Sequence, residues 1–217
     1  MLLLALDTAT PAVTAALHDG SRVVSDSHQV DARRHGELLL PAVDRVLAEA
    51  GRSPAEVTDI VVGVGPGPYT GLRVGLVTAE TLGAALGARV HGLCTLDGLA
   101  YASGLTGPFV VATDARRKEV YWARYADSRT RLGEPAVDRP AGIAAEVAGL
   151  PAVGAGAELY PEVFPDARPP AHQSAAALAS LAVERLARGE ELPAPRPMYL
   201  RRPDAQVPAG YKAVTPK

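Results

Sequence analysis

The sequence predicts a layered α/β protein, and three observations carry that prediction. The chain opens with an antiparallel meander of strands, it then alternates strands with helices, and a second, smaller set of α/β elements follows Thr106-Gly107-Pro108. An opening meander argues against a plain doubly wound fold, in which the strands run mostly parallel. With 217 residues and 47% hydrophobic side chains, the chain has enough apolar material for a substantial core.

Local patterns define the elements of the first half. Short apolar runs between turn residues predict strands, and apolar residues spaced three and four apart predict helices. The expected strands are Leu2 to Leu6, Ala12 to His18, Arg22 to Val30, Ile60 to Val64 and Val90 to Cys94. The expected helices are Arg34 to Ala50 with Pro41 as a kink or restart, a short one opened by the capping-box pattern Ser53-Pro54-Ala55-Glu56, Thr70 to Leu86, and Thr95 to Ser103.

The second half is predicted in the same way. Its expected strands are Phe109 to Thr113, Glu119 to Tyr125, a segment near Leu132 to Val137, and Ala152 to Val153, and its expected helices are Ile143 to Ala148 and Ser174 to Ala187. We therefore expect a first lobe at residues 1–105, a smaller second lobe at 106–189, and a proline-rich basic tail at 190–217. The tail contains Arg196, Arg201 and Arg202, and we expect order there only if it docks.

Composition excludes several classes of protein. The net charge of -2 argues against a protein that grips nucleic acid alone, because such proteins carry a basic footprint. The single cysteine, Cys94, cannot form an intramolecular disulfide; it lies in an apolar run and is predicted to be an inert core thiol in a reducing compartment. No apolar run has the length or flanks of a signal peptide or a membrane span, so we predict a cytoplasmic protein without membrane attachment.

The most unusual stretch runs from Asp59 to Gly87. A buried strand is followed by the turn Gly65-Pro66-Gly67-Pro68 and by a helix whose expected N-cap is Thr70. Small residues recur at every fourth position of this helix, at Gly71, Gly75, Ala79 and Gly83. Glycine inside a helix costs about 1 kcal/mol relative to alanine. We therefore expect this face to lie close to another backbone, either in the same chain or in a partner.

The glycine-rich turn does not match a known phosphate-binding signature. Both possible frames of the dinucleotide motif lack the final glycine, and the P-loop lysine is missing. Backbone N–H groups at the helix start could still hold an anion, but two prolines remove two donors, which favours a tight strand-to-helix connection. Asp7 could hold Mg²⁺ through water, although an aspartate in a turn is also ordinary.

The remaining polar groups indicate no enzyme active site. The five histidines, none of which is paired at the i, i+4 spacing of a zinc helix, are His18, His28, His35, His91 and His172. There is no G-x-S-x-G elbow, and no nucleophile is recognisable with its base. The segment from Asp114 to Glu119 is interpreted either as a recognition loop or as a solvated hairpin tip.

Three segments carry a resemblance to a known family: Leu4 to Thr10, His35 to Pro41 and Gly65 to Gly75. Two further matches are Asp114-Ala115-Arg116 with Glu119-Val120-Tyr121, and Pro197 to Arg201. In order and over nearly the whole chain, these segments closely resemble the TsaB (YeaZ) family. The Gly65 to Gly75 segment is the most specific, although the family usually has Ser-Phe where this chain has Pro68-Tyr69.

The resemblance implies a fold and a function. The fold would be the actin-like ATPase fold (ASKHA, ribonuclease H-like), with two lobes of which the second is reduced. The function would be that of a non-catalytic subunit that scaffolds and activates TsaD in forming threonylcarbamoyladenosine next to the anticodon of tRNAs. The implied partners are a TsaD-type paralogue and a TsaE-type ATPase, with tRNA reached only through the complex and a homodimer in isolation. No cofactor is expected on this chain, because ATP and Mg²⁺ would act through the partner subunits.

The resemblance also makes a prediction about metal binding by this chain. The catalytic paralogue carries a His-x-x-x-His metal pair just after the strand that follows the glycine-rich helix. Thr95 and Leu99 stand at the corresponding positions here, and neither can serve as that ligand. We therefore expect no metal site and no catalytic residue.

The resemblance implies that the chain pairs with TsaD through the two helices expected at 34–50 and 70–86. The expected partner-facing residues, some of which must face the core instead, are Leu38, Leu39, Val43, Val46, Gly71, Leu72, Gly75, Leu76 and Gly83. A vestigial nucleotide or phosphate site is the other candidate, formed by Asp7, Thr8, Gly65, Gly67 and Thr70.

Two alternative functions remain open at this point. The first is a stand-alone ATP-hydrolysing or phosphotransfer enzyme, which the actin-like fold and Asp7 would suit. The second is a metallopeptidase, for which the sequence offers no clustered ligands.

Overall fold

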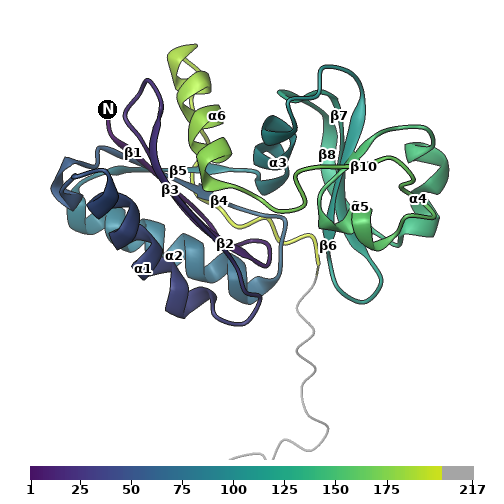
Figure 1. Ribbon diagram of the computed structural model, residues 1–217, viewed down its shortest axis with the longest axis horizontal. Coiled ribbons are helices and arrows are strands. Elements are labelled where there is room, and N and C mark those ends of the chain that lie inside the picture. The colour runs from purple at the N-terminus through teal and green to yellow at the C-terminus, as the bar shows by residue number, and fades with distance from the viewer. Residues whose placement is uncertain (202–217) are drawn as a thin grey trace, which may run out of the picture.

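The computed structural model describes residues 1–201, which form two lobes, each built on a five-stranded sheet (Figure 1). The first sheet has the strand order β3-β2-β1-β4-β5. Its strands are β1 (Leu3–Asp7), β2 (Ala12–His18), β3 (Val23–Val30), β4 (Asp59–Gly63) and β5 (Arg89–Leu93). The first three strands pair antiparallel, as the predicted meander requires, whereas β4 and β5 run parallel to β1.

The second sheet repeats this pattern with the order β10-β9-β6-β7-β8. Its strands are β6 (Phe109–Asp114), β7 (Val120–Asp127), β8 (Thr130–Asp138), β9 (Ala152–Val153) and β10 (Ala167–Arg168). Again the first three are antiparallel and the last two parallel, but β9 and β10 have only 2 residues each. The predicted actin-like architecture with a reduced second lobe is therefore confirmed.

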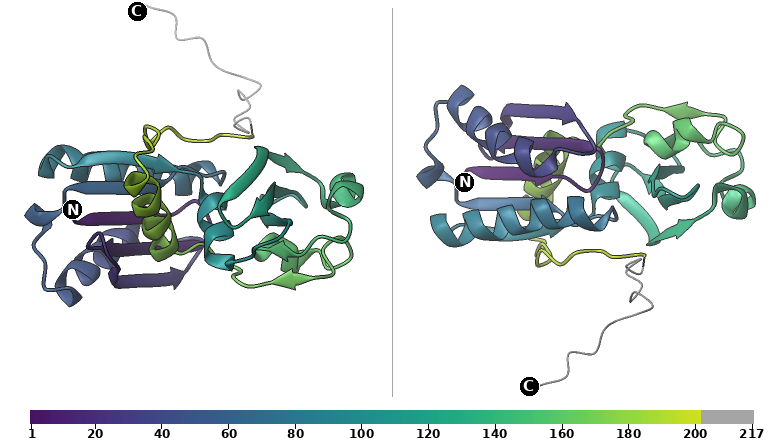
Figure 2. Two further views of the ribbon diagram at one scale, coloured as in Figure 1. Left: turned by 90° about the horizontal axis from the view of Figure 1, so that it is seen from above. Right: turned by 90° about the horizontal axis from the view of Figure 1, so that it is seen from below.

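Helices cover both faces of the first sheet. In Figures 1 and 2, α1 (His35–Glu49) and α2 (Tyr69–Leu86) lie on one face and α6 (Ala175–Ala187) crosses the other. Because both faces are covered, β1 and β4 are buried throughout and are continuous apolar runs rather than alternating ones. The remaining helices are α3 (Thr95–Ser103) between the lobes, α4 (Pro140–Val147) and α5 (Ala155–Leu159) in the second lobe, and the 3₁₀ turn η1 (Pro54–Glu56).

Helix boundaries differ from the expectation at two prolines. Thr70 is not the N-cap of α2, because the helix begins one residue earlier and Pro68, which occupies the cap position, makes no side-chain cap hydrogen bond. Pro41 lies inside α1 without causing a restart. The predicted capping box is confirmed: Ser53 accepts from the N–H of Ala55, and Glu56 accepts from the N–H of Ser53 at 2.8 Å.

The lobe boundary predicted at residue 189 is wrong, because α6 belongs to the first lobe. Its apolar stripe, including Leu178 and Ala182, packs against Leu3, Ala16 and Val61 of the first sheet. The chain thus crosses to the second lobe after α3 and returns to the first before α6 (Figure 1). An amphipathic helix shows that it has a partner surface, but its sequence does not say which of two sheets provides it.

The first part of the predicted tail docks as an extended strap, which we define as residues 190–201. Gly92 donates its N–H to the carbonyl of Pro193 at 2.7 Å, and Met198 donates to the carbonyl of Val64 at 2.8 Å. Further along, Arg201 reaches the second lobe, where it donates to the carbonyl of Ala115 and forms an ion pair with Glu119. The strap therefore connects the two lobes. Arg202 and the rest of the predicted tail lie outside the described residues.

The small-residue stripe of α2 meets its own lobe. A Cβ added at Gly71 would overlap the carbonyl oxygen of Thr8, and one added at Gly75 would lie 2.6 Å from the Thr8 hydroxyl oxygen. At the far end of the helix, a Cβ at Gly83 would overlap the side chain of Val90 on β5. The sequence predicted that the stripe lies close to a backbone either of the same chain or of a partner, and the structure shows the same chain.

This packing predicts that Gly71→Ala destabilises the isolated chain. The added methyl group has no room against the Thr8 backbone, and overpacking of this kind lowers the free energy of unfolding by about 1–3 kcal/mol. Urea denaturation followed by circular dichroism measures the change. The matched control is Gly142→Ala in α4, where an added Cβ has no atom within 4 Å and helix propensity should stabilise by up to about 1 kcal/mol. Equal stability of Gly71→Ala and wild type would contradict the assigned packing.

Candidate functional site

The floor between the lobes is formed by Asp7 at the end of β1. Its Oδ1 accepts from the N–H of Ala9 at 2.8 Å, and its Oδ2 accepts from the hydroxyl of Thr95 at 2.9 Å. The residue is fully buried, and a Cβ on the neighbouring Gly63 would overlap its carboxylate. Burial raises the pKa of Asp7 from its ordinary value of 3.8 to about 6, against the opposing effect of these hydrogen bonds. Each oxygen accepts a hydrogen bond within the protein, and the carboxylate is buried rather than exposed to the cleft.

The fully buried Gln173 lies beside this floor, in the segment that leads into α6. Its amide contributes to lowering the pKa of Asp7, although it has no hydrogen bond of good geometry to any group within residues 1–201. A Cβ on Gly98 of α3 would overlap the Gln173 side chain. Gln173 therefore helps to close the floor from the α6 side.

Only some of the residues predicted to bind phosphate line the cleft between the lobes. Thr8 donates its hydroxyl to the carbonyl of Gly71 at 2.7 Å, and Gly67 packs against the backbone of Ala9. The N–H of Gly65 donates to the hydroxyl of Thr95 at 3.2 Å. Of the five predicted residues, Thr8 and Thr70 line the cleft above the floor, whereas the other three face inward. The structure therefore describes a buried connection with two cleft-lining threonines, and phosphate binding by these residues stays a prediction.

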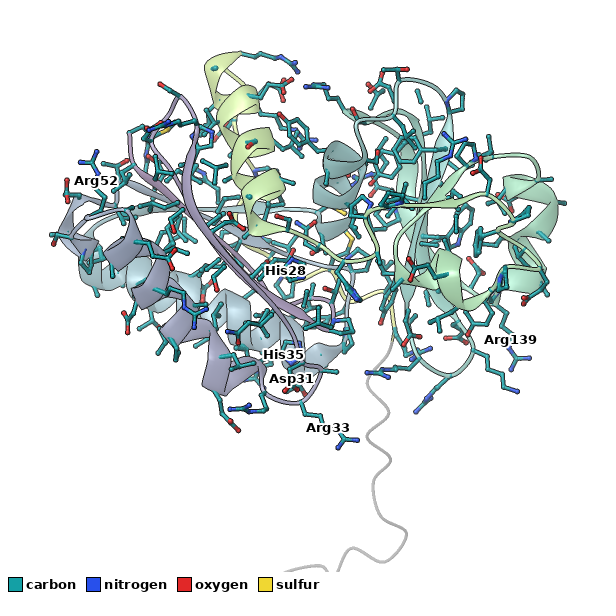
Figure 3. All side chains as sticks on the ribbon, viewed as in Figure 1. His28, Asp31, Arg33, His35, Arg52 and Arg139 are labelled. Atoms are coloured by element: carbon teal, nitrogen blue, oxygen red, sulfur yellow. The ribbon has the colours of Figure 1, made fainter. Side chains whose placement is uncertain are left out.

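The cleft above the floor has a volume of about 180 Å³ and is lined from both lobes. Its polar lining comes from the β1–β2 turn, the β3–α1 loop, the start of α2 and the β6–β7 turn, and includes Thr8, Thr10, Arg33, His35, Thr70, Asp114 and Arg116. His35 is held by contact of its Nε2 with the carbonyl of Thr10 at 2.9 Å. Figure 3 shows His35 and Arg33 together at the lower edge of the first lobe. The segment from Asp114 to Glu119, undecided in the sequence, thus forms one wall of a cleft.

A second hollow, the α1–α2 groove, lies on the outer surface of the first lobe. It has a volume of about 410 Å³, and the residues that line it are Gly36, Leu39, Leu40, Tyr69, Thr70, Arg73, Val74, Val77 and Thr78. Three of its apolar side chains are half exposed: Leu40 at 50%, Tyr69 at 51% and Val77 at 54%. Large apolar residues gathered on one surface are typical of an interaction site.

An aromatic contact lies at one end of this groove. The ring of Tyr69 lies 5.3 Å from the ring of Tyr199 on the strap, and the Arg73 guanidinium lies 5.2 Å from the centre of the Tyr69 ring. Arg73 also donates to the Tyr69 hydroxyl at 3.0 Å. The departure from the family pattern at Pro68-Tyr69 thus lies at the rim of the groove.

The predicted interface residues need correction at this point. Most of them are buried in the core of the first lobe, and one of these, Leu39, also lines the α1–α2 groove: Leu39, Val43, Val46, Gly71, Leu72, Gly75, Leu76 and Gly83. Leu38 is partly buried and packs on the same core. The outward stripe of α2 is Tyr69, Arg73 and Val77, which sequence reasoning missed. Their spacing of four residues was a usable signal, but the glycine stripe on the opposite face has the same spacing.

The histidines and the cysteine have structural roles. His91 contacts the carboxylate of Asp59 at 3.1 Å, and the rings of His28 and His172 meet edge-on at 6.5 Å. Burial raises the pKa of the Cys94 thiol to about 12, and the prediction that this thiol lies in the core is confirmed. Within residues 1–201, no group of three or more His, Cys, Asp or Glu side chains could hold a metal ion. Over the same residues, no helix is both long enough and apolar enough to cross a bilayer.

These features define a two-lobed protein with the actin-like fold, whose inter-lobe aspartate is engaged internally and whose first lobe has an apolar outer groove. Comparison with known proteins narrows the class. Residues 27–209 match the family model described as "TsaD: tRNA N6-adenosine threonylcarbamoyltransferase". A solved structure described as "YeaZ from Pseudomonas aeruginosa" is 32% identical, with a TM-score of 0.79 over 92% of this chain and 99% of that one.

Two further proteins are similar to this chain in sequence. An uncharacterised protein of Mycobacterium tuberculosis is 46% identical over 211 residues, which cover 94% of this chain and 93% of that protein. The tRNA threonylcarbamoyladenosine biosynthesis protein TsaB of Escherichia coli is 37% identical over 131 residues, which cover 58% of this chain and 55% of that protein. The chain belongs to the TsaB (YeaZ) family.

The buried carboxylate makes a prediction about pH. Because the pKa of Asp7 is raised in the folded state, the folded protein binds this proton more tightly than the unfolded chain does. The resulting stability is present below about pH 4 and is lost as the pH rises to about 6, a difference of about 3 kcal/mol. We expect Asp7→Asn to gain stability relative to wild type across this window, as measured by urea denaturation at several pH values.

Asp59→Asn is the matched control, because the sign is opposite there. Burial opposes ionisation of Asp59, but hydrogen bonds from His91, Thr58 and Arg89 hold its pKa below the usual range. That stability is present above the ordinary pKa of 3.8 and is lost as the pH falls below it. The control variant should therefore lose stability relative to wild type as the pH rises up to about 4, and the difference should stay constant between about pH 4 and 6. An Asp7→Asn difference that is flat, or that has the sign of the control, would contradict the buried and isolated carboxylate.

Proposed function

We propose that this chain is the non-catalytic subunit of a threonylcarbamoyl transferase complex, in which it scaffolds and activates a TsaD-type paralogue during threonylcarbamoyladenosine formation in tRNA. The observation that carries the proposal is the α1–α2 groove, because it places half-exposed apolar side chains on the outer surface of the first lobe. The names of the relatives supply the pathway, since the proteins of Escherichia coli and Bacillus subtilis are both described as threonylcarbamoyladenosine biosynthesis proteins.

The composition of the groove suits a protein partner. Its centre is apolar, and its rim carries an aromatic ring and a guanidinium at Tyr69 and Arg73. Tyrosine and arginine are the residue types that contribute most to binding at protein interfaces, especially around a centre that excludes water. A second copy of the chain could use the same surface, so homodimer and heterodimer would compete for it. The TsaE-type ATPase and the tRNA would then join through the paralogue.

The floor supports assigning the chemistry to the partners. Asp7 would be the natural holder of an Mg²⁺–nucleotide group, but its oxygens accept from Ala9 and Thr95. Because Asp7 makes these internal contacts, ATP and Mg²⁺ would bind to the partner subunits. This chain would then carry no cofactor of its own. Its contribution would be a rigid first lobe, because the groove is built on two helices that pack tightly on one sheet.

A charge placed in the groove should abolish pairing without unfolding the chain. Val77→Glu puts a carboxylate on an exposed position in the apolar centre, and we expect the heterodimer to weaken at least tenfold. Native mass spectrometry and calorimetric titration with the TsaD-type paralogue measure the effect, and circular dichroism checks the fold. The matched control is Leu159→Glu on α5, since Leu159 is equally exposed, at 55%, but lies in the second lobe.

Two results would overturn the proposal. The first is normal pairing of Val77→Glu together with loss of pairing in the control, which would move the interface to the second lobe. The second is steady ATP hydrolysis by the isolated chain with Mg²⁺ that disappears in Asp7→Ala. That result would favour the alternative function, an ATP-hydrolysing or phosphotransfer enzyme.

A further inference from the structure

The β6–β7 turn has an unusual backbone. Three successive residues, Arg116, Arg117 and Lys118, have φ angles of 62°, 54° and 63°. Residues with a Cβ avoid this left-handed region, and a run of three persists only where surrounding contacts fix it. Here Ala115 donates to the carbonyl of Glu119 at 3.0 Å, and Glu119 donates to that of Arg116 at 3.0 Å. The turn therefore holds three consecutive cationic residues at one exposed tip.

The acidic residues of the turn are already engaged. Asp114 accepts from the N–H of Arg116 at 2.8 Å, and its carboxylate lies 3.7 Å from the Arg116 guanidinium, a loose contact. Glu119 pairs with Arg201 of the strap, and Arg201 also donates to the carbonyl of Ala115 at 2.9 Å. The strap thus neutralises the second carboxylate and fixes the base of the turn. The cationic side chains at the tip stay exposed to solvent.

A further cation faces the tip from the other lobe. Arg33 lies in the exposed β3–α1 loop (Figure 3). It lines the same cleft as Arg116, together with the hydroxyl-bearing residues Thr10 and Thr70. The carboxylate of Asp31 next to it accepts from the N–H of Arg33 at 2.9 Å. We define the cationic mouth as Arg33, Arg116, Arg117 and Lys118. It is a local concentration of positive charge in a chain whose net charge is -2.

We propose that the cationic mouth binds the phosphate backbone of the tRNA substrate within the complex, an inference that rests on the proposed function. Guanidinium groups suit phosphate oxygens, and hydroxyl groups commonly join them in positioning a nucleic-acid backbone. The mouth also adjoins the α1–α2 groove, because Gly36, Thr70 and Val74 line both hollows. RNA held there lies beside a paralogue docked in the groove. The net negative charge fits a chain that contributes a few phosphate contacts and, by itself, binds RNA only weakly and at low salt.

The experiment uses the reconstituted complex of this chain with its TsaD-type and TsaE-type partners and a cognate tRNA. The variant is R116Q/R117Q/K118Q, which keeps long side chains and removes three charges. We expect tRNA affinity to fall about tenfold at 100 mM KCl, and the slope of log K against log salt to become shallower by about 2. The KM for tRNA should rise while kcat stays unchanged. The control, Arg52→Gln, removes one charge from an exposed ion pair with Glu56 at the far end of the first lobe (Figure 3) and should bind as wild type does.

The possible outcomes separate this inference from the proposed function. If the heterodimer forms and the triple variant binds tRNA as wild type does, the inference is wrong and the proposed function stands. If the wild-type chain does not pair with the paralogue, the proposed function fails. Ultraviolet crosslinking of the chain alone to tRNA at 50 mM KCl then decides: crosslinks at the β6–β7 turn support the inference, and none there overturns it. Inorganic phosphate serves as the last probe. If phosphate binds at the cationic mouth but the substitutions leave tRNA affinity unchanged, the mouth is a site for a small anion and the inference is wrong.

Discussion

The close approach of α2 to the β1–β2 turn is the constraint on which the rest of the structure depends. Gly71 and Gly75 allow the helix to lie directly on Thr8, and the Thr8 hydroxyl donates to the carbonyl of Gly71 at 2.7 Å. At this distance the turn has no room for a ligand between strand and helix. The same contact fixes the rotation of α2, so that Tyr69, Arg73 and Val77 face outward into the groove. The contact that closes the inner face of α2 is therefore the same contact that turns its outer face toward the groove.

The two lobes are joined by polar contacts as well as by the chain crossings. Asp97 on α3 accepts from the Tyr125 hydroxyl at 2.9 Å and from Arg131 at 2.8 Å, and it also pairs with Arg185 of α6 at 3.4 Å. This one carboxylate thus joins the helix between the lobes to elements of both. The strap adds a second connection through its contacts with β5 and the β6–β7 turn.

Periodicity predicted nearly every long element, and the resemblance predicted the two-lobed fold. What sequence could not supply was the choice between possible contacts. The stripe at Gly71 and Gly75 indicates close approach without naming the second backbone, and α6 has an apolar face that suits either sheet. Two short elements, the 5-residue helix α5 and the 2-residue strand β10, were not predicted, because they carry too few residues for a periodic signal. The closure of the floor also escaped prediction, because it joins Asp7 to Thr95, which is 88 residues away.

Hydrogen–deuterium exchange of the chain with and without its TsaD-type paralogue tests the central claim most directly. The claim is that the outer surface of α1 and α2 binds the paralogue while the inner face stays closed. We expect new protection in the first turns of α1 and α2, with α4 and α5 exchanging as in the isolated chain. Protection confined to the second lobe, or no change in either helix at saturating paralogue, would contradict the account.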